Sequence, residues 1–390
     1  MKILWIVVSL GFVFSQPQIK YLSAVVFIRY GSTTPKDFLP VMNWDSWEEK
    51  GYLELTAAGM REQYLLGREL RRRYENYNLI RTNSTNESLF QTIAHGHARS
   101  SAQSFITGFF HPYNESIDFD KKHLANPPIK LNLSLDYTLN NHSLPFGLRT
   151  VPIVTTHPSS RDIFDKDFCP HAILDLNNSF IMNDKVRSLR DTNEERFYKI
   201  IEEAYNITER DISFPNYLDL LEDILTIKRQ YRSTFLNEND ESFIEAYTHK
   251  LYPYAKMDHE DAVLHRSWRI LNYTKNFFDE IASNSTKIPR VAFIFLEDDM
   301  LLSVYSQLVK VNLNEFKVVP PSSILEMTLY TEGSDDDPKI EMKYNDNSTN
   351  MTYNGISIKT FNEFKKAVED MEKEINFDPD YCRMSYNCAE

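Results

Sequence analysis

Apolar and polar positions alternate along the chain in short blocks that predict two kinds of element. The run at 21–30 (YLSAVVFIRY) is rich in β-branched and aromatic residues and predicts a buried strand. Similar runs at 90–94 and 290–296 predict two more buried strands. The segments 325–330 and 339–344 predict a pair of neighbouring strands.

Between these runs the apolar residues recur at helical spacing. The stretch 55–74 (LTAAGMREQYLLGRELRRRY) predicts a helix that Thr56 caps, with Tyr64, Leu65 and Leu70 on its apolar face. Further helices are predicted at 100–110, 301–308 and 361–375. A strand followed by a helix, twice in succession, indicates an α/β fold with a sheet flanked by helices.

From about 164 to 283 helical patterns dominate. They cover 194–205, 216–232 and 259–281, and few β-rich runs interrupt them. This predicts a helical cap domain, placed at 161–284, that is inserted into a core domain. The α/β core is then discontinuous and consists of 16–160 and 285–390.

The N-terminus has the layout of a secretory signal peptide. A short basic start is followed by about a dozen apolar residues, and Val13 and Ser15 precede a cleavage point before Gln16. This run is shorter than the roughly 20 residues that a spanning helix needs. We therefore expect residues 1–15 to be removed and the protein to be secreted and extracellular.

Glycosylation motifs and cysteines fit that compartment. Asn-x-Ser/Thr occurs at Asn83, Asn86, Asn114, Asn132, Asn141, Asn177, Asn206, Asn272, Asn284, Asn347 and Asn350. Such a number behind a signal peptide predicts a glycoprotein with these asparagines on its surface. Three cysteines in an oxidising compartment indicate one disulfide bond and one remaining thiol.

The net charge of −13 and the pI near 5.3 disfavour nucleic acids and anionic membranes as partners. The acidic run 335–337 lies before Pro338 and is typical of a solvated turn. No ligand spacing typical of zinc is present in the sequence, so we expect neither a metal nor a cofactor.

Three stretches together resemble one family, the histidine acid phosphatases. Residues 29–35 (RYGSTTP) are similar to the family pattern Arg-His-Gly-x-Arg-x-Pro. Residues 51–74 follow the family's Leu-Thr-x-x-Gly and Leu-Arg-x-Arg-Tyr spacing, and 99–103 (RSSAQ) resembles its Arg-Thr-x-x-Ser-Ala-Gln segment. The segment 290–308 occupies the place of the family's His-Asp motif. The resemblance implies the histidine-phosphatase fold, a central mixed sheet flanked by helices with an inserted helical cap domain.

The resemblance also assigns roles, with several departures. Members of the family hydrolyse phosphate monoesters through a phosphohistidine, and arginines hold the phosphate oxygens. Carried onto this chain, the resemblance keeps the first and third phosphate arginines as Arg29 and Arg99, and the acid as Asp298. Three positions differ from the family: the nucleophile position holds Tyr30, the second arginine position holds Thr33, and the second histidine position holds Glu297.

These departures oppose phosphate chemistry. A phenol with an ordinary pKa of about 10 is scarcely ionised near neutral pH, whereas imidazole is a good nucleophile there. Glu297 would repel a phosphate oxygen about 4 Å away by roughly 4 kcal/mol at an effective dielectric of about 20. We therefore expect the chain not to be an enzyme.

Within the family, the chain is similar to the salivary acid-phosphatase-like proteins of blood-feeding insects, which share this loss. That resemblance implies sequestration of biogenic amines, such as serotonin, and of cysteinyl leukotrienes. Glu297 and Asp298 would then be amine ligands, Tyr30 would line the ring pocket, and Arg29 and Arg99 would hold a lipid carboxylate. The candidate walls of the pocket are the cap aromatics Tyr217, Phe235, Tyr247, Tyr252 and Tyr254.

The resemblance further implies a Cys169–Cys382 disulfide, with Cys388 in place of Cys382 as the alternative, and a monomer or homodimer. Other interpretations stay open from the residues. Glu297 could simply pair with Arg29 or Arg99 in a neutralised site. The rival functions are a residual phosphate-monoester hydrolase and a surface-acting salivary antigen with no function in the cleft.

Overall fold

We describe the fold from a computed structural model of the chain. The structure describes residues 19–36, 51, 53–82, 84–110, 150–155, 183–205, 214–231, 236–257, 260–283, 289–309, 311–314, 316–333 and 337–375. The predicted signal peptide, the three cysteines, Phe235 and the sequons at Asn83, Asn114, Asn132, Asn141, Asn177, Asn206 and Asn284 lie outside these residues. Among the described sequons, Asn86, Asn347 and Asn350 are exposed and Asn272 is partly buried.

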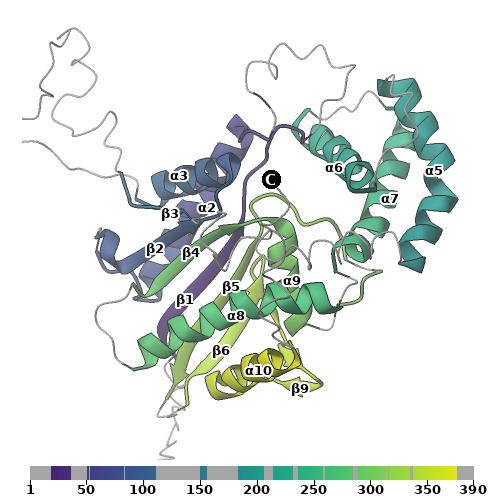
Figure 1. Cartoon of the computed structure of the whole chain (residues 1–390). Coiled ribbons are helices and arrows are strands. Elements are labelled where there is room, and N and C mark those ends of the chain that lie inside the picture. Colours follow the sequence, from purple (N-terminus) through teal and green to yellow (C-terminus); the bar gives the residue numbers. More distant parts are fainter. Residues whose placement is uncertain are drawn as a thin grey trace, which may run out of the picture.

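A mixed sheet of seven strands forms the centre of the described structure, in the order β3-β2-β4-β1-β5-β6-β7 (Figure 1). Its strands are β1 (Ile19–Arg29), β2 (Ser88–Thr92), β3 (Val154–Thr155), β4 (Val291–Leu296), β5 (Ile324–Glu332), β6 (Lys339–Tyr344) and β7 (Asn347–Thr349). β1, β2, β3 and β4 pair in parallel, whereas β5, β6 and β7 are antiparallel. The predicted α/β fold with a mixed central sheet is confirmed.

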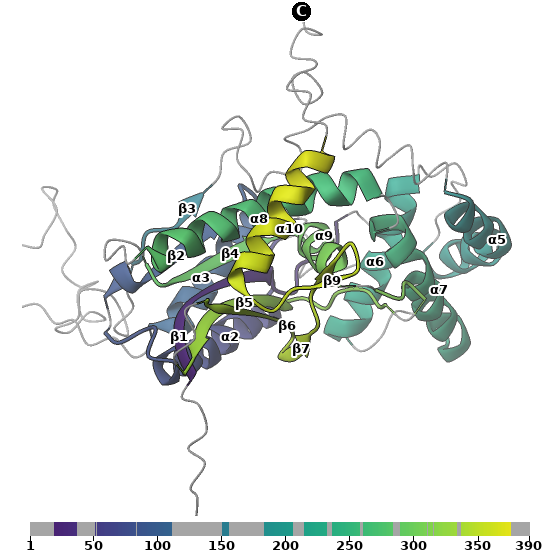
Figure 2. The same ribbon diagram turned by 90° about the horizontal axis from the view of Figure 1, so that it is seen from below.

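Helices cover both faces of this sheet because its central strands are apolar on both sides. On β1, Val26 and Ile28 pack with α2 (Ala57–Asn76) and α3 (Gly96–Phe109), and Phe27 packs on the opposite side. That opposite side carries α8 (Glu260–Ala282), α9 (Asp298–Leu308) and α10 (Phe361–Glu374) (Figures 1 and 2). Parallel strands that are buried on both faces read as continuous apolar runs, which explains the sequence of β1 and β4.

The contact between α2 and α3 depends on glycine. A Cβ atom on Gly67 would lie 2.1 Å from the backbone oxygen of Phe105, and one on Gly108 would lie 2.0 Å from that of Tyr64. Both distances are far below van der Waals contact, so only glycine allows the two backbones to approach this closely.

Three helices lie together beyond the end of the sheet and form the cap (Figures 1 and 2). They are α5 (Asp184–Tyr205), α6 (Phe214–Tyr231) and α7 (Glu238–Met257), and they share a separate apolar core. α8 falls inside the range that the sequence assigned to the cap, but Trp268, Leu271 and Phe278 on it pack with the sheet.

Most predicted elements are present, with shifted ends. Thr56 caps α2 as predicted, and its hydroxyl accepts a hydrogen bond from the amide of Gly59 at 3.1 Å. Leu65 was placed wrongly on the apolar face, since it is 50% exposed. α7 was not predicted at all. A small hairpin, β8 (Thr352–Tyr353) and β9 (Ile356–Ser357), and a short 3₁₀ turn, η1 (Thr85–Glu87), complete the described elements.

Among the described helices, none combines the length and the apolar character that crossing a membrane requires.

Candidate functional site

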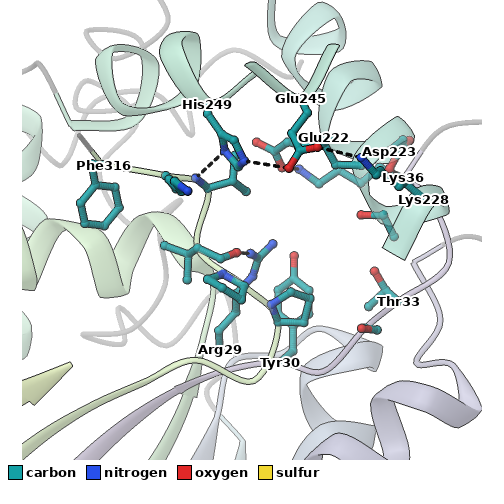
Figure 3. Close-up of a pocket in the computed structure, with 18 of the residues that line it drawn as sticks. Arg29, Tyr30, Thr33, Lys36, Glu222, Asp223, Lys228, Glu245, His249 and Phe316 are labelled. Carbon is teal, nitrogen blue, oxygen red and sulfur yellow. Dashed lines mark hydrogen bonds and ion pairs between the residues drawn. The ribbon is translucent and has the colours of Figure 1, made fainter. Parts of the chain in front are cut away.

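A cavity of about 880 Å³ lies between the ends of the central strands and the cap (Figure 3). Arg29, Tyr30 and Thr33 line it from the strand β1 and the loop that follows. The opposite wall comes from α6, α7 and the segment 316–321. Its polar, charged and aromatic side chains include Glu222, Asp223, Lys228, Glu241, Glu245, His249, Phe316 and Lys317. The volume falls in the range of small-molecule sites, roughly 300–1,000 Å³.

The fold explains why the side chains of the floor meet. β1, β2 and β4 run parallel, and in their register Arg29 is opposite Leu296 and Thr92 is opposite Phe295. The residues that follow these strands therefore emerge at one edge of the sheet. Ligands of open α/β sheets bind outside this carboxyl edge.

Two nitrogens of the Arg29 guanidinium have partners on the floor of the cavity. Its Nη2 lies 3.7 Å from Oδ2 of Asp298, and its Nη1 donates a hydrogen bond to the carbonyl oxygen of Val319. Burial alone would lower the pKa of Arg29, but the charge of Asp298 raises it above its ordinary value. Arg29 is thus a permanent cation whose two terminal nitrogens are engaged, whereas its buried Nε has no hydrogen-bond partner among the described residues.

Asp298 is buried at the start of α9 and is equally engaged. Tyr252 of the cap helix α7 donates its hydroxyl hydrogen bond to Oδ2, and the amide of Asp299 donates to Oδ1 at 3.0 Å. Burial would raise the pKa of Asp298. The positive charges of Arg29 and Lys256 outweigh burial and hold that pKa below its ordinary value, so the carboxylate is ionised.

Tyr30 is the next residue in the chain after Arg29. It lines the cavity and is 6% exposed. Its ring meets the ring of His97 edge-on, with centroids 4.3 Å apart, and the Arg29 guanidinium lies 5.4 Å from its centroid. Burial raises the pKa of Tyr30 to about 12, although the charge of Arg29 opposes this. The side chain is therefore a neutral phenol near pH 7, able to donate and accept hydrogen bonds.

Lys36, in the loop after β1, ties the core to the cap helix α6. Its Nζ lies 2.7 Å from Oδ1 of Asp219 and 3.2 Å from Oε2 of Glu222, and its backbone amide donates to Oδ1 of Asp223 at 2.8 Å. Burial would lower the pKa of Lys36, but the charge of Glu222 raises it well above its ordinary value. The cluster therefore carries three carboxylates around one ammonium.

Within that cluster one oxygen stands out. The side chain of Glu222 is 7% exposed, and its Oε2 faces Lys36. Its Oε1 is buried and receives no hydrogen bond from any residue that the structure describes. Buried carboxylate oxygens in folded proteins almost always accept a hydrogen bond, so we expect a further donor group at Oε1 of Glu222.

His249 of α7 lies on the same wall. Its Nδ1 accepts a hydrogen bond from the amide of Val318 at 3.3 Å, which places its ring proton on Nε2, 3.8 Å from Oε1 of Glu245. Burial lowers the pKa of His249, so the imidazole is neutral near pH 7. Oε2 of Glu245 pairs with Lys228 at 2.7 Å.

The predicted site residues separate in the structure. Arg29, Tyr30 and Thr33 line the cavity. Arg99 lies on α3 with its side chain exposed, and neither it nor Glu297 nor Asp298 is among the lining residues. Glu297 pairs with Nδ1 of His95 at 2.8 Å, so the alternative that paired it with Arg29 or Arg99 is not what the structure shows.

The predicted cap aromatics are mostly core residues. Tyr217 and Tyr247 share a hydrogen bond of 3.0 Å inside the cap, and Tyr254 donates to Asn314. Tyr252 is the exception with a role at the floor, through Asp298. The aromatic residues that do line the cavity are Tyr30, Phe316 and Tyr344.

Comparison with known proteins identifies the family. The family described as "Histidine phosphatase superfamily (branch 2)" matches residues 15–216, more than half of the chain. The chain belongs to this superfamily of phosphatases.

Solved structures share its fold at low sequence identity. A phytase from Klebsiella sp. ASR1 matches with a TM-score of 0.60 at 11% identity, over 91% of this chain and 96% of that one. A phytase from Citrobacter braakii matches at 0.57 and 11% identity, over 91% and 98%. A multiple inositol polyphosphate phosphatase from Bifidobacterium longum matches at 0.53 and 13% identity, over 91% and 94%.

These comparisons correct one prediction from the sequence. The expectation that the chain is not an enzyme is contradicted, because its superfamily is one of phosphatases and the matching structures are those of phytases and an inositol polyphosphate phosphatase. The departures at Tyr30, Thr33 and Glu297 concern single positions, and they do not decide the class of the whole protein.

Proposed function

We propose that the cavity binds and sequesters small mediators that combine a primary ammonium group with an aromatic ring, biogenic amines such as serotonin among them. The proposal keeps Tyr30 as a wall of the ring pocket, as the resemblance to salivary proteins implies. It moves the amine ligand from Glu297 and Asp298, which are engaged elsewhere, to Glu222 on the cap wall.

Glu222 is the observation that carries the proposal. Its Oε1 is buried beside the cavity and receives no hydrogen bond within the described residues. An ammonium group offers three donors and a positive charge, and a charge-assisted hydrogen bond of this kind contributes about 1.5–3 kcal/mol. A primary amine that reaches this oxygen would supply the missing donor.

The charges that line the cavity also support an ammonium ligand. Four acidic residues balance four permanently basic ones: Glu222, Asp223, Glu241 and Glu245 against Arg29, Lys36, Lys228 and Lys317. Glu222, Asp223 and Glu245 lie on the cap wall with Lys36 and Lys228 among them, and Arg29 lies opposite (Figure 3). The cavity as a whole is therefore near neutral, and a ligand with one positive end finds carboxylates on that wall.

Aromatic side chains complete the complementarity. Tyr30 on the floor and Phe316 and Tyr344 on the side offer ring faces and edges to an aromatic ligand. An ammonium over such a face gains about 0.5–2 kcal/mol. The neutral hydroxyl of Tyr30 is placed to exchange a hydrogen bond with a ring hydroxyl such as that of serotonin.

Cysteinyl leukotrienes form a further proposed ligand class, which the resemblance suggests. They combine carboxylates with a long apolar chain. Arg29, Lys228 and Lys317 are cationic partners for the carboxylates in a cavity that is large enough for part of the chain. Sequestration of either class requires the protein outside the cell, which is where the N-terminal pattern 1–15 predicts it to be.

Phosphate-monoester hydrolysis is a second candidate function. It is favoured by membership of the superfamily and by the acid–arginine pair Asp298–Arg29 at the carboxyl edge of the sheet. Arg29 and Lys36 would contact the phosphate, a water molecule would attack phosphorus, and the leaving alcohol would take up a proton released by that water. Asp298 is ionised and would hold Arg29 in place. Turnover of an aryl phosphate and of phytate by the purified protein tests this candidate. Release of phosphate that Lys36→Ala slows, in protein whose circular dichroism spectrum is unchanged, would establish it.

Isothermal titration calorimetry with serotonin tests the primary proposal. We expect one-to-one binding that Glu222→Gln weakens by at least tenfold, since the variant keeps the shape but removes the charge. Asp219→Asn is the matched control, because it removes a charge from the same Lys36 cluster outside the cavity lining. No binding of serotonin, histamine or noradrenaline, or equal losses in both variants, would contradict the proposal.

A further inference from the structure

A group of metal-ligand side chains lies next to the cavity, at the carboxyl ends of β2 and β4. The chain leaves β2 through His95, Gly96 and His97 into α3, and it leaves β4 at Glu297 into α9. The two strands are paired in parallel, with Thr92 opposite Phe295, so both segments emerge at the same edge. The three side chains therefore come from two parts of the chain that are some two hundred residues apart in sequence.

The donor atoms of this group converge. One ligand atom from each of His95, His97 and Glu297 lies within 4.8 Å of the other two, and Nδ1 of His95 is 2.8 Å from Oε1 of Glu297. His97 is buried, the side chain of Glu297 is 14% exposed, and that of His95 is 41% exposed. The group is thus anchored in the core on one side and reachable from solvent on the other.

We propose that His95, His97 and Glu297 bind one Zn²⁺ ion or a chemically similar divalent cation such as Co²⁺ or Ni²⁺. Two imidazoles and one carboxylate are a ligand set that zinc uses in proteins, with bonds of about 2.0–2.2 Å. Bonds of that length put neighbouring donors of a tetrahedral site roughly 3.3 Å apart. The three donor atoms lie within 4.8 Å of one another, so reaching this spacing requires only side-chain movement, for which His95 at 41% exposure has room.

The chemistry of the donors selects the kind of cation. Imidazole nitrogen suits zinc, cobalt and nickel, whereas magnesium and calcium require oxygen ligands. Three protein ligands leave the fourth position of a tetrahedral ion for water or another oxygen ligand. The site also adjoins the cavity, because the ring of His97 packs edge-on against that of Tyr30.

This inference does not rest on amine binding, and its probes are the metals themselves. The full secreted protein, with any affinity tag removed, is stripped with a chelator and titrated with Zn²⁺ by calorimetry and with Co²⁺ by visible absorption. We expect one equivalent to bind, with the intense d–d bands of a tetrahedral Co²⁺ site that Zn²⁺ displaces and a large excess of Mg²⁺ does not.

Variants assign that binding to the three residues. His95→Ala and Glu297→Gln change partly exposed side chains and are each expected to weaken Zn²⁺ binding at least tenfold while the circular dichroism spectrum stays unchanged. His249→Ala is the matched control, because this histidine lies in the neighbouring cavity wall outside the cluster. Absence of a one-equivalent site, octahedral Co²⁺ bands, or a loss in His249→Ala as large as in His95→Ala would overturn the proposal.

Discussion

The floor and the cap wall of the cavity differ in how deeply their ion pairs are buried. On the floor, Arg29 and Asp298 are buried, paired with each other and bonded further to Val319 and Tyr252. On the cap wall, Glu222 keeps one oxygen without a donor among the described residues, and the pairs around it are more exposed. The difference teaches that the buried floor holds the core and cap together, while the more exposed wall contributes less to stability and offers a carboxylate to a ligand.

The largest expected effect in this comparison is on stability and follows from breaking the floor. Asp298→Asn removes the negative partner of buried Arg29 and weakens the hydrogen bond that Tyr252 donates, because a neutral amide oxygen is a poorer acceptor than a carboxylate. Loss of one partner of a buried ion pair typically costs about 3–5 kcal/mol. We expect the free energy of unfolding, measured in urea, to fall by that order. A loss below about 1 kcal/mol would show that the floor is not a buried pair.

The same carboxylate predicts how stability depends on pH. The folded-state pKa of Asp298 is lowered, so its contribution is fully present above the unfolded pKa of about 3.9 and is lost as the pH falls through the folded-state value. The free energy of unfolding should therefore decrease with acidification below about pH 5. Urea unfolding at pH 5, 4 and 3 should show a smaller decrease for Asp298→Asn than for the unaltered chain, and equal slopes would contradict the assignment.

A smaller loss is expected for Tyr252→Phe, which removes only the hydrogen bond that the cap donates to Asp298. Hydrogen bonds to charged groups contribute about 1.5–3 kcal/mol. Thermal unfolding should detect a destabilisation of that size. Tyr254→Phe is the control, because its hydroxyl bonds to Asn314 at the surface and should change the midpoint by much less.

The smallest effect is expected on the exposed part of the wall. Glu245→Gln weakens the ion pair in which Nζ of Lys228 lies 2.7 Å from Oε2 of Glu245. Both side chains are more than a third exposed to solvent. Solvent screening limits such pairs to about 0.5 kcal/mol or less. Urea unfolding should place this variant within error of the unaltered protein, and a loss as large as that of Tyr252→Phe would erase the distinction between wall and floor.

Sequence patterns predicted the strands and most helices because each is a local periodic signal. Runs such as 21–30 are apolar without interruption, and Thr56 is a local capping signal. α7 escaped prediction because it mixes many polar residues with Pro253 inside the helix. Leu65 was misplaced because the buried side of α2 runs through Gly67, Leu70 and Tyr74, and Leu65 points away from it.

The site was only half predictable for a different reason. Arg29, Tyr30 and Thr33 belong to one local motif, and all three line the cavity. The contact between Lys36 and Glu222 joins residues that are 186 positions apart, so no local sequence pattern predicts it. The cluster of His95, His97 and Glu297 was not predicted for the same reason. The expectation of no metal considered only the spacing of ligands along the sequence.

The central claim is that the cap wall, not the strand ends, recognises the amine. One measurement tests it directly, which is serotonin affinity by calorimetry for Glu222→Gln beside Glu297→Gln, in buffer with a chelator so that no metal intervenes. The account predicts a loss of at least tenfold for Glu222→Gln, about 1.4 kcal/mol or more, and a change of less than about twofold for Glu297→Gln. The reverse ranking, with the larger loss at Glu297, would contradict it.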